Sequence, residues 1–113
     1  MLEDELNSVD AVLNHIEKVE IKEGIFDEHV IQKDLIRAYF DLELALASLC
    51  ILLRKMSENL FIHIDEDIRR DINSIIHSNK FEYHDHDRIY VYSQKGKEPV
   101  DLNNLLRFAR SIL

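Results

Sequence analysis

Apolar residues follow a helical rhythm through the first half of the chain. Over residues 2–22 they recur at intervals of four and three, which predicts one stripe of an amphipathic helix: Leu2, Leu6, Val9, Leu13 and Ile16. Asp27 can cap a second helix that runs to about Asn59, or that breaks once near Ser57. Over residues 42–53 this helix is apolar nearly all round. We therefore expect it to be the central, most buried helix of a bundle, to form part of a dimer interface, or both.

The second half of the chain combines shorter helices with a strand pattern. Asp65 can cap a helix that ends near His77 and has isoleucines along one face. Residues 88–93 alternate in the manner of a strand, and after a turn the chain can return as an edge strand through Pro99. Asp101 can cap a last helix.

Together these elements predict a mainly all-α fold for a single domain over residues 1–113. We expect a four- to five-helix up-down bundle with a small β-hairpin near residues 88–100. In that arrangement one tyrosine face of the hairpin covers the bundle, and its lysines discourage pairing of the edge with another strand.

Composition indicates the cellular compartment in which we expect the protein and excludes several classes of protein. One cysteine excludes a disulfide framework and a cysteine-rich zinc site. The sequence has no signal-peptide pattern, and its apolar run of 12 residues over 42–53 is shorter than the roughly 20 needed to span a bilayer. We therefore expect a cytoplasmic protein with no membrane partner.

The net charge of −8 is distributed unevenly. Residues 1–68 hold 16 acidic and 6 basic residues, whereas residues 69–113 hold 6 acidic and 8 basic residues. The acidic balance excludes a bulk polyanion binder, but a local nucleic-acid site is still possible in the last part of the chain.

The segment RDINSIIH, residues 70–77, carries the main candidate chemistry. On a helix, Glu66, Arg70, Asn73 and His77 share one face. The Arg70 guanidinium can bind phosphate oxygens, and the His77 imidazole can move a proton from a ribose 2′-hydroxyl or to a leaving oxygen, with no metal. The alternative is the ordinary solvated face of an amphipathic helix.

One pattern in this segment is Arg70, the polar Asp71 directly after it, and His77, with six residues between the arginine and the histidine. This pattern resembles the signature of the HEPN family of helical domains. The resemblance covers about the last eighty residues and implies a helical bundle that forms a homodimer with two motifs in one cleft. Many HEPN domains are metal-independent RNases of toxin–antitoxin, phage-defence or CRISPR-associated systems, and others are inactive RNA-binding or scaffold modules. The resemblance implies that Arg70 and His77 are catalytic and that Asp71 or Asn73 assists.

Two further groups of residues suggest binding sites. Arg88, Lys95 and Lys97 lie among tyrosines and could contact the phosphates of RNA while the rings stack on bases. His84 and His86 could share a metal ion, but nothing at a recognised spacing completes a closed zinc site. We therefore expect no metal and no cofactor.

Two hypotheses from other functional classes remain open. The acidic stretch of residues 1–68 could dock on a basic partner protein, as immunity proteins, antitoxins and nuclease inhibitors do. The chain could also be a structural subunit that oligomerises through its apolar helix.

Overall fold

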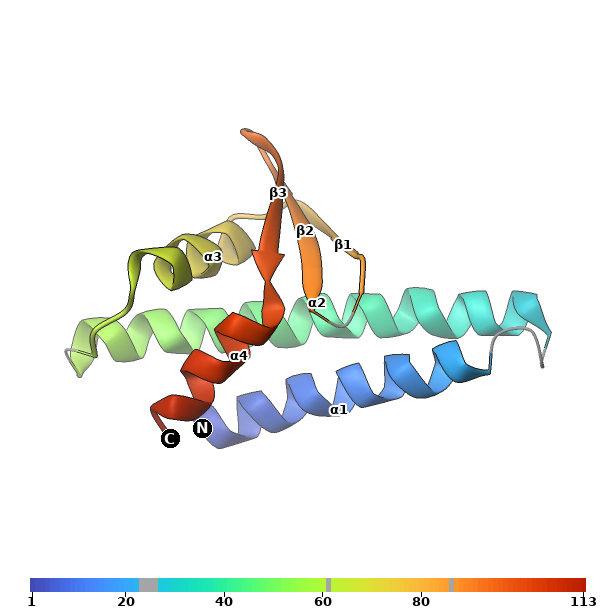
Figure 1. The fold of residues 1–113 in the computed structure, drawn as a ribbon, viewed down its shortest axis with the longest axis horizontal. Coiled ribbons are helices and arrows are strands. Elements are labelled where there is room, and N and C mark those ends of the chain that lie inside the picture. The colour runs from blue at the N-terminus through green and yellow to red at the C-terminus, as the bar shows by residue number, and fades with distance from the viewer. Residues whose placement is uncertain (23–26, 61, 86) are drawn as a thin grey trace.

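Two long antiparallel helices form the base of the molecule in the computed structural model, which describes residues 1–22, 27–60, 62–85 and 87–113 (Figure 1). Helix α1 spans Leu2–Ile21, and helix α2 spans Glu28–Asn59. The Asp27 carboxylate caps α2 as predicted, because its Oδ1 accepts a hydrogen bond from the His29 backbone N–H at 2.8 Å. The second helix does not break near Ser57.

Two short helices and a sheet complete the fold. Helix α3 spans Glu66–Ile76, strands β1, β2 and β3 span Lys80–Tyr83, Arg88–Ser93 and Gly96–Asp101, and helix α4 spans Leu102–Ser111. The strands form one antiparallel sheet in the order β1-β2-β3. The mainly helical class is confirmed, with four helices in the described part of the chain. Within the described ranges only α1 and α2 form a long up-down pair, because α3 and α4 are short and the three strands lie between them in the sequence.

The predicted hairpin is a three-stranded sheet, because β1 joins its free edge. Phe81 pairs with Val91 across the two strands, and Tyr83 pairs with Ile89. The segment around β1 has no helical period and is largely polar, so the sequence did not predict a strand there. Its two aromatic rings face the core, where they are half-buried. Pro99 lies on edge strand β3 as predicted.

The sheet covers the helices with its aliphatic face rather than its tyrosine face. Ile89, Val91 and Val100 are buried, whereas Tyr90 and Tyr92 lie on the outer side. The expectation that the tyrosine face covers the bundle is therefore wrong. The β-branched side chains fill the space above α2, and the outer position lets the tyrosine hydroxyls reach polar partners such as Glu82.

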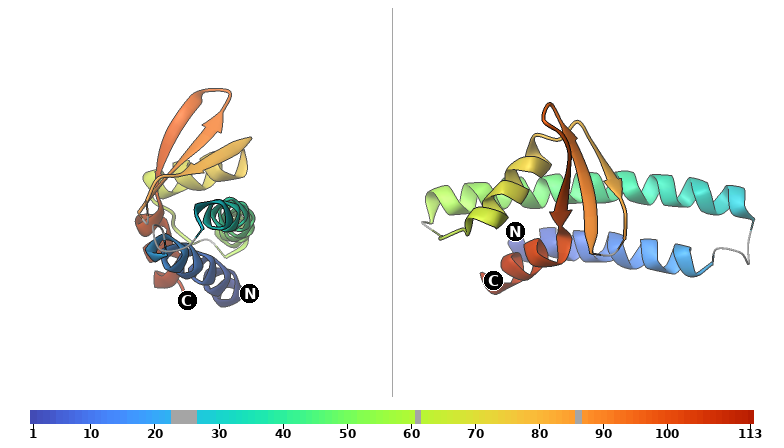
Figure 2. Two further views of the ribbon diagram at one scale, coloured as in Figure 1. Left: turned by 90° about the vertical axis from the view of Figure 1, so that its right-hand side faces the viewer. Right: turned by 45° about the horizontal axis from the view of Figure 1, so that its top comes forward.

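Helix α2 is the central layer of the molecule, as its apolar run predicted. It lies between α1 on one side and α3 with the sheet on the other (Figure 2). Leu42, Leu46 and Leu49 on this helix are fully buried, and the buried side chains of all four helices and the sheet form one core. An ion pair of 2.6 Å between Arg110 and Asp10 joins α4 to α1. No helix in the described ranges is long and apolar enough to cross a membrane.

Candidate functional site

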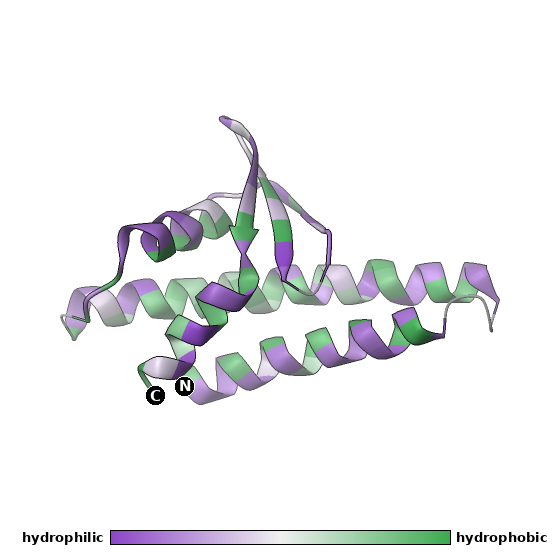
Figure 3. Cartoon of the chain, viewed as in Figure 1, coloured by the Kyte–Doolittle hydropathy of each residue, from purple (hydrophilic) through white to green (hydrophobic). Residues whose placement is uncertain are grey.

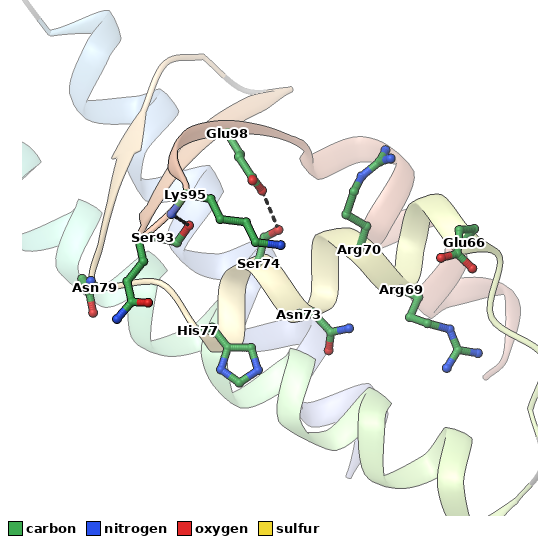
Figure 4. Close-up of a pocket in the computed structure, with 11 residues that line it drawn as sticks. Glu66, Arg69, Arg70, Asn73, Ser74, His77, Asn79, Ser93, Lys95 and Glu98 are labelled. Carbon is green, nitrogen blue, oxygen red and sulfur yellow. Dashed lines mark hydrogen bonds between the residues drawn. The ribbon is translucent and has the colours of Figure 1, made fainter.

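A cleft of about 720 Å³ lies between α3 and the turn that joins β2 to β3 (Figure 4). Helix α3 and the sheet side contribute to its lining in nearly equal parts. The lining residues are Glu66, Arg69, Arg70, Asn73, Ser74 and His77 from α3 and its C-cap, and Asn79, Ser93, Gln94, Lys95 and Glu98 from the sheet side.

The amphipathic character of α3 fixes which residues face the cleft. Ile68, Ile72 and Ile75 are buried against the core, so the opposite face of the helix is presented outward. His77 is the C-cap residue, and its backbone N–H donates to the Asn73 carbonyl at 3.0 Å. Its imidazole is exposed at the end of the polar face and can reach a ligand in the cleft.

The structure separates the two side chains of the predicted catalytic pair. Arg70 and His77 both line the cleft, but Figure 4 shows Arg70 extending to the opposite side of α3 from His77. The Arg70 guanidinium lies 3.5 Å from the Asp67 carboxylate, one turn earlier. Arg69 and Asn73 lie on the same side of α3 as His77 (Figure 4). Arg69 was missed, although its spacing of four and eight residues from Asn73 and His77 already places the three on one face.

Contacts between α3 and the sheet hold the second wall of the cleft. The Ser74 hydroxyl donates to the Glu98 carboxylate at 3.1 Å and so ties the middle of α3 to β3. Lys95 projects from the β2–β3 turn and extends over Ser74 (Figure 4). Gly96 gives the turn its shape with a φ of 105°, a conformation that other residues rarely adopt.

The charges of the lining favour an anionic ligand. The lining contains three positively charged side chains, those of Arg69, Arg70 and Lys95, and two carboxylates, those of Glu66 and Glu98. Positive charges therefore outnumber negative charges by one. Polar donors fill the remaining positions of the lining, among them the amides of Asn73 and Asn79. A phosphate group fits this combination of guanidinium, ammonium and amide donors.

Asp71, predicted to assist the catalytic pair, lies outside the cleft. It is 7% exposed and is the only buried charged residue in the described part of the chain. Burial raises its pKa to about 6, against the opposing effects of Arg70 and of a hydrogen bond from the Asp101 backbone N–H. The carboxyl group therefore connects α3 to the start of α4.

Of the three predicted nucleic-acid contacts, only Lys95 lies at the cleft. The Lys97 ammonium lies 4.5 Å from the centre of the Tyr90 ring on the outer face of the sheet, and 3.8 Å from the Glu82 carboxylate. Arg88 borders a separate hollow of about 480 Å³ next to Asp71. A hydrogen bond with Tyr90 and nearby carboxylates raise the pKa of Arg88.

The described ranges hold no metal site around His84. The His84 ring packs edge-on against Tyr90, with 5.7 Å between the ring centres. Its partner in the hypothesis, His86, lies outside the described residues. Among the described residues, no three histidine, cysteine, aspartate or glutamate side chains are placed to hold one ion.

No protein-family model, curated protein or solved structure matches this chain. The indications of function therefore come from the residues that line the cleft and from the motif at residues 70–77.

Proposed function

We propose that the cleft between α3 and the β2–β3 turn binds single-stranded RNA and cleaves it without a metal ion, in the manner of HEPN ribonucleases. One observation carries the proposal. Arg69, Asn73 and His77 lie on the same side of α3, and Lys95 from the sheet lines the same cleft. The likeness of residues 70–77 to the HEPN motif supports the same chemistry.

In this mechanism His77 acts as the general base. The imidazole takes the proton of a ribose 2′-hydroxyl, and the 2′-oxygen attacks the adjacent phosphorus. A bond forms between the phosphorus and the 2′-oxygen, and the bond to the 5′-oxygen breaks. The products are a 2′,3′-cyclic phosphate and a 5′-hydroxyl, whose proton comes from water. The Arg69 and Lys95 cations stabilise the charge that builds up on the phosphoryl oxygens.

The test is cleavage of a labelled single-stranded RNA in the presence of EDTA. We expect His77→Ala and Arg69→Ala to lose cleavage while their circular dichroism spectra stay unchanged. Arg107→Ala is the matched control, because Arg107 is exposed on α4, away from the cleft lining. Arg70→Ala decides which arginine acts, since the motif favours Arg70 and the side-chain directions favour Arg69.

Two outcomes would contradict this proposal in different ways. RNA left intact by the wild-type chain at high concentration excludes catalysis. Fluorescence anisotropy then separates an inactive RNA-binding module, which binds RNA and loses affinity in Arg69→Ala, from a protein with no RNA site.

The outer side of α1 favours a second candidate function, as an acidic interaction protein that binds a basic partner. Glu3, Asp4, Glu17 and Glu20 are exposed there. Binding steered by such a surface weakens steeply with salt and is lost in the double variant Glu3→Lys with Glu17→Lys. Capture of a basic protein that persists in high salt would contradict this function. Both functions assume a cytoplasmic protein, as expected from the sequence.

A further inference from the structure

The outer side of α2 exposes large apolar side chains that no other helix or strand of the described residues covers. Ile36 is 67% exposed, Phe40 58%, Leu44 53% and Ile51 40%. At about 100° per residue these positions, with Ala47 between them, form one stripe along the side of the helix opposite the buried leucines. We call these five residues the α2 stripe.

The arrangement of the elements leaves this side of α2 open. Figure 2 shows α2 nearly end-on, with α1, α3, the sheet and α4 gathered on the other sides. Figure 3 shows apolar bands along the whole of α2. The stripe runs from residue 36 to residue 51, which is about 22 Å of helix. A continuous exposed stripe of this length is typical of an interface with another protein.

Charged residues at the two ends of the stripe indicate what covers it. Lys33 and Asp34 precede the stripe, and Lys55 and Glu58 follow it. All four are exposed, and none forms an ion pair within the described ranges. At 100° per residue Lys33 and Glu58 fall within the arc of the stripe, whereas Asp34 lies about 120° from its centre. The stripe therefore offers a positive side chain at its start and a negative side chain at its end to an incoming helix.

We propose that the α2 stripe is the interface of a homodimer in which the α2 helices of two copies pack antiparallel. An axis between residues 45 and 46 places Phe40 opposite Ile51 of the second copy, and Leu44 opposite Ala47 of the second copy. A large side chain then meets a smaller one at the centre, which lets the helices approach closely.

The same register pairs opposite charges. Lys33 lies opposite Glu58 of the second copy. The two-fold axis makes this pair occur twice, so two ion pairs flank the stripe. A parallel arrangement would instead place Lys33 opposite Lys33. In the antiparallel register, Arg37 of one copy falls at the level of Arg54 of the second copy. The two positions lie about 100° apart around the helix, so these arginines occupy opposite flanks of the interface.

The first experiment measures the molar mass by sedimentation and light scattering over a range of protein concentrations. We expect a wild-type dimer and, in Leu44→Glu, a dissociation constant at least about 100-fold weaker, because two buried leucines are lost per dimer. Leu113→Glu is the matched control, since Leu113 is an exposed leucine too (66%, against 53% for Leu44) but lies at the C-terminus. A monomeric wild-type chain overturns the proposal and assigns the stripe to a different protein. A dimer that Leu44→Glu leaves intact overturns it as well.

The second experiment tests the register through charge exchange. Lys33→Glu and Glu58→Lys each place like charges opposite one another in their own dimers, so each alone is expected to weaken the dimer. When the two variants are mixed, the glutamate introduced in one chain meets the lysine introduced in the other. The unchanged Glu58 and Lys33 meet in the same way, so a heterodimer forms in preference to either homodimer.

Native mass spectrometry measures this preference. A statistical mixture of the two homodimers and the heterodimer overturns the antiparallel register. Neither experiment depends on the RNA activity.

Discussion

The buried carboxyl group of Asp71 makes the stability of the protein depend on pH. We consider the substitution Asp71→Asn, which keeps the shape of the side chain and removes its ionisation. The amide oxygen can still accept the hydrogen bond that the Asp101 backbone N–H donates. The substitution therefore removes the cost of burying a charge and retains the connection between α3 and α4.

The size of the change in the free energy of unfolding follows from the pKa of Asp71 in the folded and the unfolded state. The pKa is about 6 in the folded protein and 3.8 in an ordinary exposed aspartate. Between these values the unfolded chain releases its proton while the folded protein keeps it, so stability falls as pH rises. Above pH 6 the full cost applies, and a difference of about two pKa units corresponds to about 3 kcal/mol. Below pH 3.8 both states are protonated and the cost disappears.

Urea unfolding followed by circular dichroism at several pH values from about 4 to about 8 measures the effect. We expect Asp71→Asn to exceed the wild type by about 3 kcal/mol above pH 6 and to converge with it near pH 4. Asp67→Asn is the control, because Asp67 is exposed on the same helix and forms only a surface ion pair with Arg70. If Asp71→Asn were less stable than the wild type at pH 8, the argument from burial would be refuted.

Three further substitutions test the packing, the helix cap and the turn, each by urea unfolding at a fixed protein concentration. Leu46→Ala removes a fully buried side chain from the centre of α2 and should cost about 3 kcal/mol, whereas Asn14→Ala on the exposed side of α1 should change stability by less than about 0.5 kcal/mol. Asp101→Ala removes the cap of α4, whose carboxylate accepts from the Asn104 N–H at 3.0 Å, and should cost about 1 kcal/mol. Gly96→Ala should cost about 1 kcal/mol for its backbone alone, because φ is 105° and no atom lies near the added methyl group. For each of the three substitutions, a variant that is as stable as the wild type would contradict the expected loss of stability.

The helices could be predicted because their determinants are local. The apolar stripe of α1 and the caps at Asp27 and Asp101 depend on residues a few positions apart. Strand β1 could not be predicted in this way, since it is fixed by pairing with β2 and by the stacking of Tyr83 on Tyr39, whose ring centres are 5.1 Å apart. That contact joins residues far apart in the sequence.

The candidate site shows the same division between local and distant determinants. The spacing along α3 correctly places Asn73 and His77 on one outward face. It also predicted Arg70 on that face, but the Arg70 side chain extends to the other side of the helix and pairs with Asp67, and Arg69 lies on the side of Asn73 and His77. The second wall of the cleft, with Lys95, is positioned by the hydrogen bond between Ser74 and Glu98, which are 24 residues apart.

The layered fold also changes how the acidic composition bears on an RNA site. Helix α1, whose Glu3, Asp4, Glu17 and Glu20 are exposed, lies on one side of α2, whereas α3 and the β2–β3 turn lie on the other (Figure 1). A helix with its side chains is about 10 Å across, and charges separated by more than about 8 Å of salt solution are largely screened at physiological ionic strength. An RNA strand in the cleft would therefore respond mainly to the charges of the lining, which are the cations of Arg69, Arg70 and Lys95 and the carboxylates of Glu66 and Glu98. Residues 1–22, on the opposite side of the molecule, hold 6 acidic and 2 basic residues and so account for half of the net charge of −8, and their repulsion of RNA would turn the strand toward the cleft.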